Sequence, residues 1–221
     1  SIQNAALKLN VTGQTATVKG DFVAGEGGAP NTVIDINGSV TPSPPTKTAL
    51  SETVTLTTPQ APSGAINLGN VDLRSGESII LNAGDYNLTG LRASGGSASG
   101  QPNAIYANGK VTLYISGDVD VKDFVILARD SAQNPKPQNV TIKVIGDHEV
   151  KLKQDTNIYG VVYAKDSEIE LKQSTVYGAV VADEIKVSGS ASIHYDEALS
   201  TSGDYISGTT VDVLSWREMN Q

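Results

Sequence analysis

Three carboxylates have a spacing that could support chemistry: Asp118, Asp120 and Asp123. Carboxylates that converge can hold calcium, or can act as acid and base on a glycosidic bond at separations of roughly 5 to 9.5 Å. Val119 and Val121 alternate with the first two, and successive strand residues point to opposite faces. If the valines are buried, the carboxylates face water, where charged residues are expected. We interpret them as a solvated row and predict no metal and no cofactor; a calcium or catalytic site is the alternative.

The two histidines, His148 and His194, do not complete a catalytic set. His148 follows a Gly-Asp pair, which is typical of a turn. A Ser–His pair gains weight from a Gly-x-Ser-x-Gly turn around the nucleophile, and the sequence contains none. We therefore predict no catalytic residues and no enzyme activity. A carbohydrate-active enzyme built on a β-helix is the competing hypothesis.

Tyrosines and one histidine form a candidate interaction surface: Tyr159, Tyr163, Tyr177 and His194. Apolar residues precede Tyr159, Tyr177 and His194, so burial of those apolar residues turns the rings outward. Tyrosine rings combine apolar area with a polar tip and are common in binding surfaces. The alternative is that the rings pack beneath the C-terminal segment, which carries the only tryptophan, Trp216.

An internal repeat contains these residues. Leu-Lys-Gln-Asp-Thr-Asn-Ile-Tyr-Gly from Leu152 returns as Leu-Lys-Gln-Ser-Thr-Val-Tyr-Gly from Leu171, and more weakly from Val187. A spacing of about 16 to 19 residues fits one coil of a β-solenoid. Farther upstream, the alternating run from Val111 returns from Val140, and the extra length is assigned to a loop at 131–138, where Asn and Pro are frequent.

The repeated units alternate apolar and polar residues with period two, as half-buried strands do. One unit cannot bury its apolar row alone, but stacked coils turn Leu152, Leu171 and Val187 into one interior column. The sequence therefore predicts an all-β fold, a right-handed parallel β-solenoid (β-helix) with inserted loops.

The chain divides into three segments. Residues 1–65 read as an irregular β-rich segment with a Pro-rich excursion, residues 66–199 as the solenoid, and residues 200–221 as a segment that packs on the solenoid. A stack of parallel coils ends in unpaired backbone groups, so we expect the C-terminal segment, with Trp216 as anchor, to close it.

Charge and cysteine content restrict the partners. The formal net charge is −8, which disfavours nucleic acid, because such binding relies on Lys and Arg. A basic patch of Lys143, Lys151, Lys153 and Lys172 would favour it. Cysteine is absent, which excludes disulfides and suits export. No apolar run is long enough to span a bilayer, and the first residues lack the pattern of a signal peptide.

The order of several short motifs resembles the C-terminal solenoid region of PilX-type type IV pilus assembly proteins, a group of minor pilins, over residues 66–218. The motifs are Gly84-Asp85-Tyr86-Asn87-Leu88, the run from Gly109 to Val119, Ile158-Tyr159-Gly160, the run from Val176 to Val181, the run from Ile193 to Leu199, and Ser215-Trp216-Arg217-Glu218.

This resemblance implies a non-catalytic structural or interaction module on the surface of a bacterial pilus, exported from the cell, with major or minor pilins as partners. Membrane contact would come only through an N-terminal helix that has no counterpart here. The alternative is an adhesin or a DNA-uptake minor pilin that captures surface polysaccharide, a host protein or DNA.

Overall fold

The computed structural model describes residues 56–96, 100–196 and 198–199, together with the backbone of five N-terminal strands. Those five are β1 (Lys8–Gly13), β2 (Thr17–Val18), β3 (Phe22–Ala24), β4 (Ile34–Gly38) and β5 (Lys47–Ala49). The rest of the fold is built from β6 (Ile66–Arg74), β7 (Ser78–Ser94), β8 (Asn103–Ile115), β9 (Val119–Val121), β10 (Phe124–Ala128), the 3-10 helix η1 (Pro137–Asn139), β11 (Val140–Val144), β12 (Val150–Leu152), β13 (Thr156–Lys172), β14 (Ser174–Ser188) and β15 (Ser192–Tyr195). Within the described residues, no helix could cross a bilayer.

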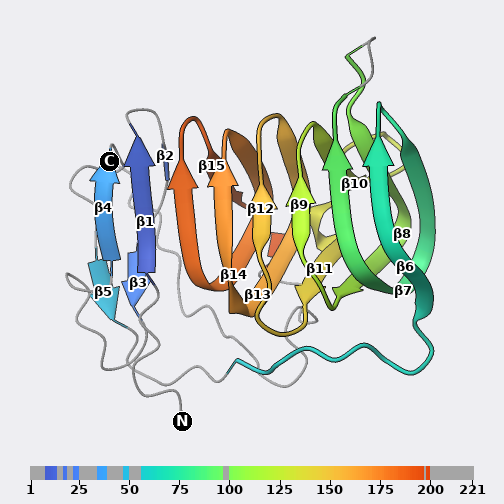
Figure 1. The fold of residues 1–221 in the computed structure, drawn as a ribbon, viewed down its shortest axis with the longest axis horizontal. Coiled ribbons are helices and arrows are strands. Elements are labelled where there is room, and N and C mark those ends of the chain that lie inside the picture. Colours follow the sequence, from blue (N-terminus) through green and yellow to red (C-terminus); the bar gives the residue numbers. More distant parts are fainter. Residues whose placement is uncertain are drawn as a thin grey trace.

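The strands pair in parallel, coil upon coil, along the long axis of the molecule (Figure 1). Leu152 lies beside Leu171, and Leu171 beside Val187, and these side chains are 1%, 0% and 0% exposed. β11 pairs with β8 so that Val140 lies beside Val111, and the predicted loop falls between β10 and β11. The parallel β-solenoid and its buried column are therefore confirmed.

Each coil has three sides. We name two of them by their outward residues and the third, the covered face, by the segment 56–65 that is hydrogen-bonded to it. The aromatic face consists of the strand segments 78–82, 103–108, 124–128, 156–159, 174–177 and 192–194. The covered face consists of 84–88, 111–115, 140–144, 161–164 and 179–182. The charged face consists of 71–74, 91–93, 119–121, 150–152, 169–171 and 185–187.

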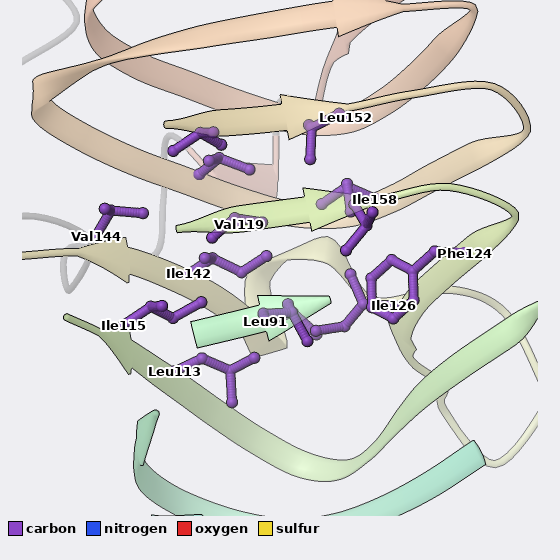
Figure 2. Close-up of a cluster of buried hydrophobic side chains, with 14 of the residues drawn as sticks. Leu91, Leu113, Ile115, Val119, Phe124, Ile126, Ile142, Val144, Leu152 and Ile158 are labelled. Carbon is purple, nitrogen blue, oxygen red and sulfur yellow. The ribbon is translucent and has the colours of Figure 1, made fainter. Parts of the chain in front are cut away.

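Apolar residues from all three sides fill the interior (Figure 2). Leu113 lies beside Ile142 and Ile142 beside Val162, so one coil covers the apolar row of the next. Phe124 and Ile126, on the aromatic-face strand β10, point into the same core. Burying each such side chain is worth roughly 1.5 to 3 kcal/mol, which explains how short strands make a stable body.

The corner between the charged face and the aromatic face uses left-handed backbone. Ser75, Asp123, Asp155 and Gln173 have φ values of 57°, 50°, 56° and 54°. Two glycines, Gly95 and Gly189, have the same conformation at the equivalent corners. Asp123 is thus a corner residue, and its carboxylate accepts a hydrogen bond from the Gly96 amide (3.3 Å). Asp123 therefore serves as a turn residue and does not share the charged face with Asp118 and Asp120.

Asn103 is a buried polar residue at this corner, and it supplies our first stability prediction. Its Oδ1 accepts from the Gly76 amide at 3.0 Å, and its Nδ2 donates to the carbonyls of Gly95 and Asp123, both at 3.4 Å. Asn103→Ala removes the partner of the Gly76 amide and one of the two donors to each carbonyl, which keep only the backbone amides of Ser75 and Asn103. We therefore expect the free energy of unfolding in urea to fall by about 1 to 3 kcal/mol. The exposed Asn108→Ala is the control. Equal effects of the two changes would contradict this role of Asn103.

The N-terminal strands extend the end of the solenoid that is formed by β14 and β15, which we call the far end. β1 pairs with β14, β4 pairs with β1, and β2 pairs with β15, all in parallel. Residues 56–65 then run lengthwise along the molecule to β6 at the opposite end (Figure 1). They are tied to the covered face by a hydrogen bond from the Tyr163 hydroxyl to the Thr57 carbonyl (2.7 Å) and by one from Thr58 to Asp166 (3.2 Å).

The segment expected to close the solenoid, residues 200–221 with Trp216, lies outside the described residues. The end that this segment was expected to cover is the one that pairs with β1 and β2. The N-terminal segment therefore satisfies backbone groups that the sequence assigned to the C-terminal one.

Candidate interaction surface

Tyr159, Tyr177 and His194 form a stacked row on the aromatic face. Strand pairing puts the three in register. The ring centroids of Tyr159 and Tyr177 are 4.6 Å apart with an interplanar angle of 11°, and those of Tyr177 and His194 are 5.1 Å apart at 13°. Because Tyr177 is stacked on both sides, the row presents ring edges, hydroxyl groups and imidazole nitrogens to the outside.

Two glycines let the coils approach at this row. Gly160 and Gly178 directly follow Tyr159 and Tyr177, and they lie beside each other. A Cβ on Gly178 would lie 2.0 Å from the Gly160 carbonyl oxygen. Each repeated Tyr-Gly pair thus places a ring on the aromatic face and a glycine next to it, where the backbones of adjacent coils come close together.

The surroundings of Tyr159 favour its protonated form. Burial raises the pKa of the Tyr159 hydroxyl, and the neighbouring Tyr177 raises it further, while Arg129 opposes the shift. The Tyr159 hydroxyl is therefore a hydrogen-bond donor throughout the neutral pH range.

A polar column accompanies the row. Asn157, Thr175 and Ser192 lie in register, one outward position before Tyr159, Tyr177 and His194. The Ser192 hydroxyl donates to the Thr175 hydroxyl at 3.3 Å. We call these six residues the Tyr–His patch: Asn157, Tyr159, Thr175, Tyr177, Ser192 and His194. The patch offers hydroxyl, amide and imidazole groups on rigid strands.

Tyr163 does not belong to this surface. It lies past the Gly160 corner, on the covered face, and is 3% exposed. Burial raises the pKa of its hydroxyl, and that hydroxyl donates to Thr57. The sequence prediction grouped it with Tyr159 because the two are close in the chain, whereas the corner turns them to different sides.

A second uncharged group on the same face was missed by sequence reasoning. Ile80 and Tyr106 lie in the column of the aromatic row, and both are exposed. Beside them, the Asn108 amide donates to the Asn82 side-chain oxygen at 3.2 Å. The period-two pattern of 78–82 and 103–108 could have revealed the group, because Ile80 and Tyr106 hold equivalent outward positions.

The charged face has the opposite character. Its central column alternates in sign from coil to coil: Asp72, Arg92, Asp120, Lys151, Glu170 and Lys186. Each of the four inner charges therefore lies between two of opposite sign about 4.8 Å away. Such surface pairs contribute little stability individually. If a strand paired with the next strand but one in the stack, however, charges of the same sign would lie opposite each other.

Of the three carboxylates that the sequence offered as a candidate site, Asp118 and Asp120 lie on this face, and each has a partner of its own. Asp120 pairs with Lys153 at 2.6 Å. Asp118 accepts from the Glu149 amide at 3.2 Å and lies 3.7 Å from the His148 ring. Among the described residues, no three acidic or histidine side chains are grouped as a metal site.

The four lysines of the hypothetical basic patch are not together. Lys151, Lys153 and Lys172 belong to the charged face, where Lys151 pairs with Glu149 at 2.7 Å. Lys143 lies on the covered face, with its Nζ 5.5 Å from the centroid of the Tyr114 ring. Acidic residues between the lysines make the charged face unsuited to a polyanion.

Comparison with known proteins identifies a family. A family model described as "Domain of unknown function (DUF7305)" matches residues 66–202. No curated protein matches the chain. A solved structure of a glycosylated ice-binding protein from an Arctic yeast is 12% identical with a TM-score of 0.47, covering 87% of this chain and 92% of that one. An ice-binding protein domain (DUF3494) from Shewanella frigidimarina is 11% identical with a TM-score of 0.25, covering 87% and 95%.

These findings correct the resemblance stated from the sequence. The family model that matches residues 66–202 is not that of the PilX-type proteins. The resemblance to minor pilins is therefore wrong. The pilus function, the pilin partners and the location on a pilus followed from it alone, and they are withdrawn with it.

Proposed function

This chain belongs to the family described as a domain of unknown function (DUF7305), and we propose that it is a non-catalytic module that binds an uncharged polysaccharide through its aromatic face. The proposal rests on one observation, the segregation of charge between the outer faces of a rigid solenoid.

The two outward columns of the aromatic face contain no Asp, Glu, Lys or Arg in the described residues. One column is Ser78, Ala104, Val125, Asn157, Thr175 and Ser192; the other is Ile80, Tyr106, Leu127, Tyr159, Tyr177 and His194. The central column of the charged face is composed entirely of charged residues over the same coils. Columns without charged side chains favour an uncharged ligand, because an ionic ligand would lose its water there without gaining a charged partner in either column.

The chemistry of the Tyr–His patch suits a ligand rich in hydroxyl groups. Tyr, Ser and Asn side chains supply adaptable hydrogen bonds and contact area at a low entropy cost, as in antibody binding sites. The rings are fixed before binding by their mutual stacking, which reduces the ordering cost of association. The ring faces of Tyr177 are occupied, so we assign the recognition to ring edges and polar tips.

The same proposal places the protein outside the cell. Extended polysaccharides are encountered there, and a chain without cysteine has no thiol that an oxidising environment could modify. Catalysis is not part of the proposal, since Asp118, Asp120 and Asp123 have separate partners.

The test is binding of the full chain to amorphous cellulose, chitin and starch, measured by depletion from solution. We expect at least one of them to be bound, with Tyr177→Ala weakening binding by about tenfold, the loss typical of a central contact residue. Lys172→Ala on the charged face is the matched control and should have no effect. Binding should also persist at high salt, because no ion pairs are involved.

Two results would refute the proposal. One is the absence of binding to all three polymers. The other is binding that Tyr177→Ala leaves unchanged although circular dichroism shows an intact fold.

A further inference from the structure

Ile80, Asn82, Tyr106 and Asn108 form a second patch that the proposed function leaves unused. Ile80 is 73% exposed, more than any other large hydrophobic side chain among the described residues, and Tyr106 is 36% exposed. Ile80 and Tyr106 are cross-strand neighbours, and a pair of this kind contributes only about 0.2 to 1 kcal/mol to the fold. Exposed apolar groups bordered by polar ones mark binding surfaces.

The second patch is collinear with the Tyr–His patch. Ile80 lies beside Tyr106, and Tyr106 beside Leu127. The pairing of Ile126 with Ile158 puts Leu127 in line with Tyr159. Tyr106 and Tyr159 are therefore two strand spacings apart, or about 10 Å along the solenoid axis.

The outward side chain of the rung between the patches is buried. Leu127 is 5% exposed, and the loop that ends in η1 leaves the coil directly after β10. Lys136 holds this loop by an ion pair with Asp130 (3.2 Å) and by a hydrogen bond from its amide to the Ala128 carbonyl (2.8 Å). The aromatic face thus has two exposed contact zones separated by one buried rung.

We infer that the second patch is a further subsite for the same uncharged polysaccharide, bound with its chain along the solenoid axis; this inference rests on the proposed function. The two patches follow each other along the axis, whereas across the axis each patch is only two outward columns wide. A polymer of identical units can match such a row only lengthwise. The Asn82–Asn108 amide pair provides donors and acceptors for sugar hydroxyls, beside the apolar contact of Ile80 and Tyr106.

Chain length distinguishes this inference from the proposed function. A trimer of the bound sugar has one unit for each of the three rungs of the Tyr–His patch and can fill that patch alone, whereas a hexamer has one unit for each of the six rungs of the face and should bind more tightly through linked contacts. In Ile80→Ser/Tyr106→Ser, we expect hexamer affinity to fall about tenfold, toward that of the trimer, with trimer affinity unchanged. Tyr177→Ala should weaken both. Affinities are measured by calorimetry with oligomers of the polymer that the full chain binds.

Ile66→Ser is the matched control, because Ile66 is also exposed at this end of the solenoid but lies outside the aromatic face. If the double variant leaves hexamer affinity unchanged while Tyr177→Ala lowers it, the second subsite is refuted and the proposed function survives. If neither oligomer binds the unmodified protein, the proposed function fails. A dimer that dissociates in the double variant, seen by light scattering, would instead make this patch an interface between copies and overturn the inference.

Discussion

Gly178→Ala is expected to lower the free energy of unfolding by more than about 3 kcal/mol, the upper end of the usual cost of overpacking. The new Cβ would lie 2.0 Å from the Gly160 carbonyl oxygen and 2.7 Å from its carbon, both backbone atoms that cannot rotate away. The φ of Gly178 is +151°, which side chains rarely adopt. The two coils must therefore separate, which breaks the pairing of β13 with β14.

Thermal unfolding followed by circular dichroism measures this effect. For a chain of this size, 3 kcal/mol corresponds to a fall in Tm of roughly 6 to 12 °C. The control is Gly64→Ala, where the added Cβ meets no heavy atom within 4 Å. A Tm for Gly178→Ala equal to that of this control would show that β13 and β14 are not in the close register described here.

Deletion of residues 1–55 is expected to convert the protein into self-associating species. It removes β1 and β2 and so leaves the outer edges of β14 and β15 without backbone partners. Unpaired parallel edges recruit other chains, and repeat proteins need terminal caps for solubility. Light scattering across a concentration series should show mass rising with concentration in the truncated protein, and not in the full chain.

A chain lacking residues 200–221 is the matched control for this deletion. The sequence predicted that this segment closes the solenoid, whereas β1 and β2 pair with that end. We therefore expect the control to scatter light like the full chain. Self-association of the control, with the N-terminal deletion remaining unaffected, would show that the C-terminal segment is the cover.

Much of the solenoid could be predicted because the patterns that specify it lie within one strand or between neighbouring repeats of the sequence. The alternation around Leu152, Leu171 and Val187 reports which side of a strand is buried, and the repeat reports that the coils are stacked in register. The outward position of Asp120 follows from the same alternation. Likewise, equivalent positions in successive repeats put Tyr159, Tyr177 and His194 in one column, and these rings are stacked in the structure.

The family assignment could not be obtained in this way. Gly-Asp and Tyr-Gly pairs occur at the turns of many β-proteins, since turn geometry selects them regardless of ancestry. Their order suggested minor pilins, and the family match over residues 66–202 shows otherwise.

The sequence by itself determined the strands, their inward and outward sides and the stacking of neighbouring coils, because period and repeat act over one or two coils. Only the tertiary structure decided which outward residues share a face. Corners such as Gly160 redirect the chain, so Tyr163 is buried under residues 56–65 while Ile80 and Tyr106 join the aromatic column. It also decided that β1 and then β4 extend the solenoid beyond β14. The pairing of β1 with β14 joins segments more than 160 residues apart, and no local pattern encodes such a contact.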